Sequence, residues 1–160
     1  MGKNGCSCSI GIEDSKRKAI AHDLMKFLAD TYALYLKTQN YHWNVEGEHF
    51  RTLHLMFEEQ YNDLVGAVDS VAERIRSLGE RAPGGFAAFQ KLTCISDARE
   101  KISAEEMVKD LLVGHEAVIC AGRKLIKAAE EAHDVSTADM LTTRLESHEK
   151  TAWMLRATVS

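Results

Sequence analysis

The sequence contains little that would interrupt a helix and no pattern of a disulfide framework. Its single proline is Pro83, and strong helix formers fill most of the remaining chain, which predicts an all-α fold. Four cysteines occur in 160 residues. Cys6 and Cys8 lie close together near the start, whereas Cys94 and Cys120 stand alone. This spacing argues against a disulfide scaffold and favours a reducing, cytoplasmic location.

Long apolar runs and an excess of positive charge are also missing. No segment approaches the roughly 20 apolar residues of a membrane-spanning helix, and the first residues lack the apolar core of a signal peptide. We therefore expect a cytoplasmic protein without a membrane partner. Because the formal net charge is -4, binding to DNA would depend on a local basic segment. The cations near the start are Lys3, Lys16, Arg17 and Lys18. They are sparse for a DNA-binding tail and fit better as a solvated tail and the first turns of a helix.

Apolar residues at helical spacing fill most of the chain, which is long enough to bury one ordinary core. We expect a flexible tail over residues 1–14 and a single bundle domain over residues 15–160. The predicted long helices cover residues 15–42, 49–78, 103–132 and 137–159. Phe86, Phe89 and Leu92 predict a short amphipathic helix inside the long connection between the second and third of these helices.

Two short connections with a long one between them predict two helical hairpins joined by a crossover, which is a four-helix bundle topology. Bundles with a di-iron core typically carry Glu-x-x-His on two of their helices. The spacing from Glu46 to His49 falls at a helix start and is interrupted by Gly47. We therefore do not expect a core di-iron site of that type. His115 lies on a helix face of mixed packing and is expected to be structural.

A stripe of potential metal ligands lies on the second long helix, away from its apolar face. At about 100° per residue, the apolar residues share one side, and four polar residues fall between roughly 100° and 200° from it. These four are His54, Glu58, Asp69 and Glu73. His54 with Glu58, and Asp69 with Glu73, are spaced i to i+4, so each pair can converge on one ion. The plain alternative is a charged and solvated helix face.

The two pairs cannot meet on one ion within a single chain. Glu58 and Asp69 are eleven residues apart, which is about 16 Å along a helix, whereas ligands lie about 2 Å from their metal. A second copy of the helix, antiparallel about a two-fold axis near residues 62–63, would place each pair opposite the other pair of the partner chain. Gly66 on that face would allow the partner helix to approach closely.

His42, near the end of the preceding helix, favours the metal interpretation. After a short turn, the antiparallel arrangement of the two helices can return His42 toward His54 and Glu58. Two imidazoles with several carboxylates suit iron better than magnesium or calcium, although zinc, manganese or cobalt fit the same ligands.

Three motifs carry these residues: HWN at 42–44, HLMFE at 54–58 and DSVAER at 69–74. Together they resemble the ferroxidase signature of Dps proteins, the mini-ferritins of bacteria and archaea. The stretch ADMLTTRLESHEKTAWMLR resembles the last helix of that family, so the likeness covers nearly the whole chain from about Ser15. The resemblance implies a ferritin-like four-helix bundle that assembles as a hollow homo-dodecamer, with ferroxidase sites between two-fold-related subunits.

The resemblance also assigns iron binding and catalysis to five residues, three from one subunit and two from its partner. The first three are His42, His54 and Glu58, and the other two are Asp69 and Glu73. Many relatives have Asp where this chain has Glu58, and the longer side chain changes the reach of that carboxylate. Hydrogen peroxide, or more slowly dioxygen, would oxidise ferrous iron at the site, and the ferric product would be stored in the cavity. This chemistry suppresses hydroxyl radicals and protects the cell from oxidative stress.

Two further features carry alternatives. Trp43 would intercept stray radicals or, as the favoured interpretation, act as an aromatic wedge at the subunit interface. The resemblance also implies that iron enters through three-fold pores lined by acidic residues near the start of the last helix. The matching residues are Glu130, Glu131, Asp134 and Asp139, of which Asp139 fits best. Asp134 and Asp139 also suit a helix N-terminus without any role in a pore.

Two other functions stay open at this point. One is a DNA-compacting protein, associated with the nucleoid, that uses the same shell without ferroxidase activity. The other is a plain helical interaction module that takes up no metal. The sparse cations of the tail favour iron storage over DNA binding. Cys6 and Cys8 have the spacing of a metal or redox pair, but free thiols on a mobile tail explain them better.

Overall fold

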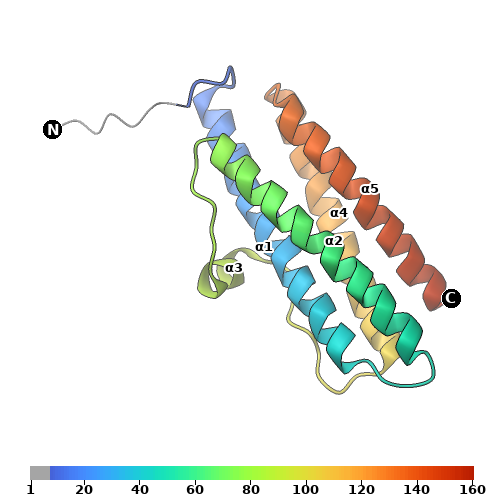
Figure 1. Ribbon diagram of the computed structural model, residues 1–160. Coiled ribbons are helices and arrows are strands. Elements are labelled where there is room, and N and C mark those ends of the chain that lie inside the picture. Colours follow the sequence, from blue (N-terminus) through green and yellow to red (C-terminus); the bar gives the residue numbers. More distant parts are fainter. Residues whose placement is uncertain (1–7) are drawn as a thin grey trace.

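The structure, a computed structural model, describes residues 8–160 as four long helices with a short helix at their side (Figure 1). The long helices are α1 (Asp14–Asn44), α2 (Phe50–Ser77), α4 (Ala104–Glu131) and α5 (Val135–Thr158). The short helix α3 (Phe86–Leu92) lies in the crossover from α2 to α4. These described residues form no strand. The predicted all-α bundle and the helix in its crossover are therefore confirmed.

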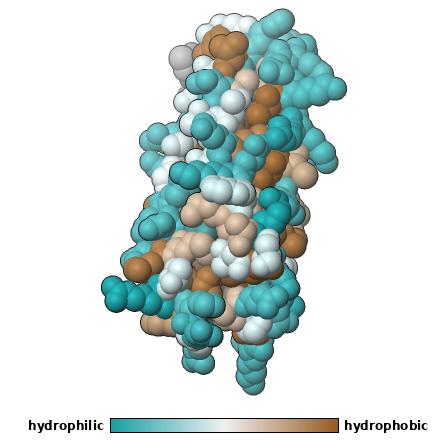
Figure 2. Space-filling view, turned by 90° about the vertical axis from the view of Figure 1, so that its right-hand side faces the viewer, coloured by the Kyte–Doolittle hydropathy of each residue, from teal (hydrophilic) through white to brown (hydrophobic). Residues whose placement is uncertain are grey.

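The bundle is held together by the apolar stripes of its long helices. α1 packs against α2 and α4, and α5 packs against α4 and, less extensively, against α2. The stripe predicted on α2 is buried, with Leu53, Phe57, Leu64, Val71 and Ile75 in the core. Each such side chain contributes about 1.5–3 kcal/mol when it is removed from water. Figure 2 shows that polar side chains cover most of the outer surface on one side of the bundle, with small apolar groups between them. None of the helices within residues 8–160 is long and apolar enough to cross a membrane.

Two helix starts show how local side chains set the boundaries. The predicted capping box is present, because the Ser103 hydroxyl accepts from the backbone N–H of Glu106 at 3.2 Å and the Glu106 carboxylate accepts from the backbone N–H of Ser103 at 2.9 Å. α5 begins at Val135, two residues earlier than predicted. The reason is that the Asp134 carboxylate accepts from the backbone N–H of Thr137 at 3.0 Å and caps the helix there.

The crossover is tied to α1 by buried polar contacts. The Asp30 carboxylate accepts from the Thr93 hydroxyl at 2.8 Å. The Tyr41 hydroxyl donates to Asp110 on α4 at 2.5 Å and accepts from the backbone N–H of Arg99 at 2.9 Å. These contacts hold the crossover along α1, so that α4 begins beside the C-terminal end of α1.

A pair of histidines lies inside the bundle between α4 and α5. His115 and His148 are 2 % and 0 % exposed, and their Nδ1 atoms are 2.9 Å apart, so one ring donates to the other. Within residues 8–160, the Nε2 atoms of both rings have no hydrogen-bond partner. Burial lowers the pKa of both rings, that of His115 to about 3, and the positive charge of Arg144 lowers both further. His115 is structural, as predicted, and His148 is its partner in the core.

This pair makes the protein less stable in acid. In the folded protein the pKa of each ring lies below the ordinary value of 6.5. At a pH between the folded and the ordinary pKa of a ring, the unfolded chain therefore binds more protons than the folded chain. The free energy of unfolding therefore falls as the pH drops below 6.5 toward 3. For a His115→Leu/His148→Leu double variant, we predict that the free energy of unfolding falls less than in the wild type between about pH 7.5 and about pH 5. Denaturant unfolding at each pH measures it. An equal fall of the free energy of unfolding in both proteins would show that the histidine pair does not cause the loss of stability in acid.

Candidate metal centre

The turn between α1 and α2 brings two histidines into ring contact. His42 lies in the last turn of α1, and His54 lies near the start of α2. Gly47, whose φ of 110° suits glycine, lies in the connection between them. The ring centroids are 3.8 Å apart and the ring planes differ by 18°, so the rings stack. The expected return of His42 toward His54 is therefore present.

Reciprocal hydrogen bonds fix the tautomer of both rings. Nδ1 of His42 lies 2.8 Å from the carbonyl oxygen of His54, and Nδ1 of His54 lies 2.8 Å from the carbonyl oxygen of His42. A carbonyl oxygen only accepts, so each Nδ1 carries the proton and donates it. In the neutral rings, each Nε2 then keeps a free lone pair, which is the state that binds a metal ion.

Glu58 lies one turn beyond His54 and is half-buried. Tyr61 follows it on α2, and the Tyr61 ring meets the His42 ring edge to face, with centroids 5.1 Å apart. Burial raises the pKa of Tyr61, and the negative charge of Glu58 raises it further. The Glu58 carboxylate therefore lies beside the Tyr61 hydroxyl.

Asp69 and Glu73 lie farther along α2, and both are exposed. The neighbouring Arg74 points into the bundle, where it donates to the Asp134 carboxylate at 2.6 Å and to the Thr137 hydroxyl at 2.8 Å. Over the described part of the chain, no three His, Cys, Asp or Glu side chains come close enough together to hold a metal ion. One chain thus brings His42 and His54 together but does not gather Glu58 with them, and it leaves Asp69 and Glu73 apart.

The surface around these residues is partly apolar. Trp43 is 66 % exposed, and Phe50, Leu55 and Val65 are also exposed. The Phe50 ring stacks on the His54 ring with centroids 5.1 Å apart. A Cβ atom added at Gly66 would meet nothing within 4 Å among the described residues outside its own stretch of α2. Apolar groups beside acidic ones suit a surface that a partner covers.

One of the four predicted pore residues has a structural role instead. Asp134 is 2 % exposed, caps α5 and pairs with Arg74, so the alternative of a helix N-terminus accounts for it. Because its carboxylate is engaged inside the subunit, we leave Asp134 out of the proposed pore. Glu130, Glu131 and Asp139 are exposed and stay candidates.

The basic residues of the N-terminal segment are mostly engaged in contacts within the chain. Arg17 is buried, donates to the carbonyl oxygen of Leu78 and pairs with Asp14 at 2.6 Å. Lys18 also pairs with Asp14, at 3.0 Å. The predicted candidates Lys3 and Cys6 lie outside the described residues. Cys8 is a free thiol that donates to the carbonyl oxygen of Ser77 at 3.5 Å.

Sequence reasoning missed Tyr61 and Phe50 as neighbours of the histidines. Tyr61 lies three residues after Glu58 and seven after His54, so it shares their helix face. That spacing is a signal in the sequence. The reciprocal bonds to backbone carbonyls have no comparable signal, because they depend on the angle at which α2 leaves the turn.

Three comparisons with known proteins agree on the fold of this chain. Residues 22–160 match the family described as the ferritin-like domain. The DNA protection during starvation protein of Brevibacillus brevis is 36% identical, and the match covers 91% of this chain and 98% of that protein. An uncharacterized low temperature-induced protein of Nostoc sp. is 40% identical over 93% of this chain and 84% of that protein. A Dps structure from Vibrio cholerae, described as a member of a superfamily of ferritin-like diiron-carboxylate proteins, has a TM-score of 0.91 at 30% identity. It covers 95% of this chain and 96% of that one.

The pair of Arg74 and the buried Asp134 predicts different effects for Asp134, which caps α5, and for Asp139, which lies within it. Asp134→Ala removes a helix cap and leaves a partly buried arginine unpaired, so we expect the free energy of unfolding to fall by about 2 kcal/mol or more. Asp139→Ala, the matched control on the exposed surface, should change it by about 0.5 kcal/mol or less. Thermal or denaturant unfolding at equal subunit concentration measures both. If Asp134→Ala and Asp139→Ala both lower the free energy of unfolding by equal, small amounts, Asp134 becomes a pore candidate again.

Proposed function

Because the chain belongs to the Dps family of ferritin-like proteins, we propose that it oxidises ferrous iron and stores the ferric product in a hollow dodecamer in the cytoplasm. Hydrogen peroxide, or more slowly dioxygen, is the oxidant. The observation that carries the proposal is the stacked pair of His42 and His54, whose hydrogen bonds leave both Nε2 atoms free to bind a metal ion.

Two subunits share each proposed site. His42, His54 and Glu58 of one subunit face Asp69 and Glu73 of the partner subunit across a two-fold axis. The exposed acids of α2 and the open space beside Gly66 support this arrangement, and a two-fold interface repeats the site twice. Two imidazoles and three carboxylates bind ferrous iron, and the carboxylate oxygens favour the harder ferric ion, which assists its oxidation.

The proposed reaction consumes peroxide without releasing radicals. Two ferrous ions give one electron each to hydrogen peroxide, which takes two protons and becomes two molecules of water. The two ferric ions are the product of the reaction. They leave the site and mineralise in the cavity. Iron reaches the cavity through three-fold pores, for which Asp139, Glu130 and Glu131 supply exposed carboxylates.

DNA binding is the second candidate, because the relatives from Brevibacillus brevis and Bacillus anthracis are named DNA protection during starvation proteins. In this chain, Arg17 is buried and Lys18 is paired with Asp14, so the described start of α1 offers few free cations. Phosphate contacts supply most of the affinity for DNA. We therefore propose iron oxidation, and not DNA binding, as the main function.

Removing ligands from either half of the site should slow iron oxidation. We predict that His54→Ala, Asp69→Ala and the double variant each form ferric iron at least about tenfold more slowly than the wild type, since loss of even a supporting partner of a metal ligand costs 10–100-fold. The measurement is the absorbance of ferric iron after anaerobic loading with ferrous iron and addition of peroxide.

Glu59→Ala is the matched control, because Glu59 is an exposed acid of α2 outside the proposed ligand set. It should oxidise iron at the rate of the wild type. Light scattering on every variant separates loss of assembly from loss of a ligand. Rates in the double variant that equal those of the wild type would refute the ligand assignment.

A further inference from the structure

Arg74, the residue directly after the proposed ligand Glu73, is fixed inside the bundle. Its guanidinium donates to the Asp134 carboxylate at 2.6 Å and to the Thr137 hydroxyl at 2.8 Å. The side chains of Arg74 and Asp134 are 18 % and 1 % exposed, so the pair lies largely out of water, where a charged hydrogen bond is strong. Asp134 caps α5 and Thr137 lies in its first turn. Arg74 therefore ties the end of α2 to the start of α5.

This tie sets the rotation of α2, because α2 and α5 touch over a short stretch and α5 packs mainly against α4. A second ion pair, between Arg144 and Asp63, joins the two helices near the middle of α2. Asp69 and Glu73 lie between these two ties. Successive residues of a helix point about 100° apart, so an Arg74 held in the bundle fixes the direction in which Glu73 leaves the helix.

The cations at the end of α2 are also kept away from its acidic residues. Arg76 lies three residues after Glu73, which is the spacing of a helical ion pair. Its guanidinium instead donates to the backbone carbonyl of Glu80 at 2.8 Å. None of the salt bridges among residues 8–160 involves Asp69 or Glu73. The negative charge of these two carboxylates is therefore available to a cation.

We propose that Arg74 is a positioning residue for the half of the iron site that each subunit presents to its partner, with Asp134 and Thr137 as its anchors. The inference rests on the proposed iron oxidation at shared sites. Arg74 acts through Glu73 and makes no contact of its own with iron. It holds the last turns of α2 in one rotation, and thereby the place at which Glu73 meets the partner subunit. A small displacement of a ligand is costly at such a site.

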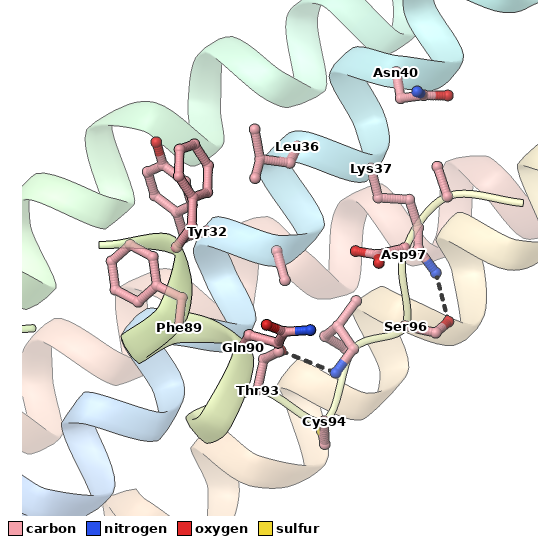
Figure 3. Close-up of a pocket in the computed structure, with 14 residues that line it drawn as sticks. Tyr32, Leu36, Lys37, Asn40, Phe89, Gln90, Thr93, Cys94, Ser96 and Asp97 are labelled. Atoms are coloured by element: carbon pink, nitrogen blue, oxygen red, sulfur yellow. Dashed lines mark hydrogen bonds between the residues drawn. The ribbon is translucent and has the colours of Figure 1, made fainter. Parts of the chain in front are cut away.

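Lys37 offers a matched control in another part of the bundle. It is also a buried cation held by one carboxylate and one hydroxyl, because its Nζ lies 3.1 Å from Asp110 and donates to the Ser96 hydroxyl at 3.2 Å. Figure 3 shows the contact with Ser96 in a pocket of about 590 Å³, whose lining comes from α1, α3 and the segment that follows α3. Loss of Lys37 thus removes a similar contact without touching α2.

Steady-state kinetics of the assembled protein, with ferrous iron and peroxide, gives the first test. In Arg74→Met we expect the KM for ferrous iron to rise about tenfold, with kcat near that of the wild type, because the ligands are present but less well placed. Thr137→Val removes one anchor and should raise KM by less. The double variant should be no worse than Arg74→Met, since both changes break the same contact. Lys37→Met should keep the wild-type KM.

Mixed shells identify the half of the site that Arg74 serves. Arg74→Met shells are unfolded, mixed with an equal amount of His54→Ala shells and reassembled, and the rate is measured at ferrous iron below the wild-type KM. One site of each mixed pair then combines an intact His54 with a well-placed Glu73, so random pairing should give about one quarter of the wild-type rate. A mixture of Arg74→Met with Asp69→Ala should gain nothing, because both chains are defective in the same half.

The outcomes separate the two proposals. A wild-type KM in Arg74→Met and Thr137→Val, or no gain of rate in the mixture with His54→Ala, would overturn the positioning role and leave iron oxidation by the wild type intact. An equally raised KM in Lys37→Met would also overturn it, since loss of any buried cation would then have the same effect. A wild type that forms no ferric iron would refute both. Thermal unfolding and light scattering check each variant, and Thr137→Val replaces Arg74→Met in the mixtures if Arg74→Met does not assemble.

Discussion

The mutual hydrogen bonding of His42 and His54 is the contact on which the account depends. Each ring donates through Nδ1 to the backbone of the other residue, so the bonds that close the turn between α1 and α2 also set the tautomer of both imidazoles. The stacked rings have little freedom to rotate. Folding of the turn and preparation of the two proposed metal ligands are therefore one event, and a ligand arrangement formed in advance binds an ion with less loss of entropy.

One set of polar contacts directs a cation of α2 away from this surface. Arg74 points inward to Asp134 and Thr137, while its neighbour Glu73 stays exposed. The Tyr61 ring packs edge to face against the rings of His42 and Tyr35. The apolar stripe of α2 is used inside the subunit, so its opposite face is free to carry ligands. One helix thus serves the core of its own chain and the proposed site between chains.

Much of this could be predicted from the sequence, because it follows from helical periodicity. The bundle, the short helix in the crossover and the capping box at Ser103 are confirmed. The start of α5 was wrong by two residues, because capping by Asp134 is combined with a non-local pair to Arg74. The contact of His115 with His148 joins residues 33 apart, and the packed rings of Tyr61, Tyr35, Tyr32 and Phe89 join three separate elements. Such contacts depend on how helices are rotated against each other, which a single helical wheel does not contain.

The central claim is that each site takes ligands from two subunits, and mixed assemblies test it most directly. His54→Ala and Asp69→Ala shells are each unfolded, mixed and reassembled together. A mixed pair contains one site with both His54 and Asp69 intact and one site with neither. Random pairing of equal amounts should therefore restore about one quarter of the wild-type rate of iron oxidation, although each variant alone is slow. A mixture that is no faster than the two variants measured separately would contradict a site shared between subunits.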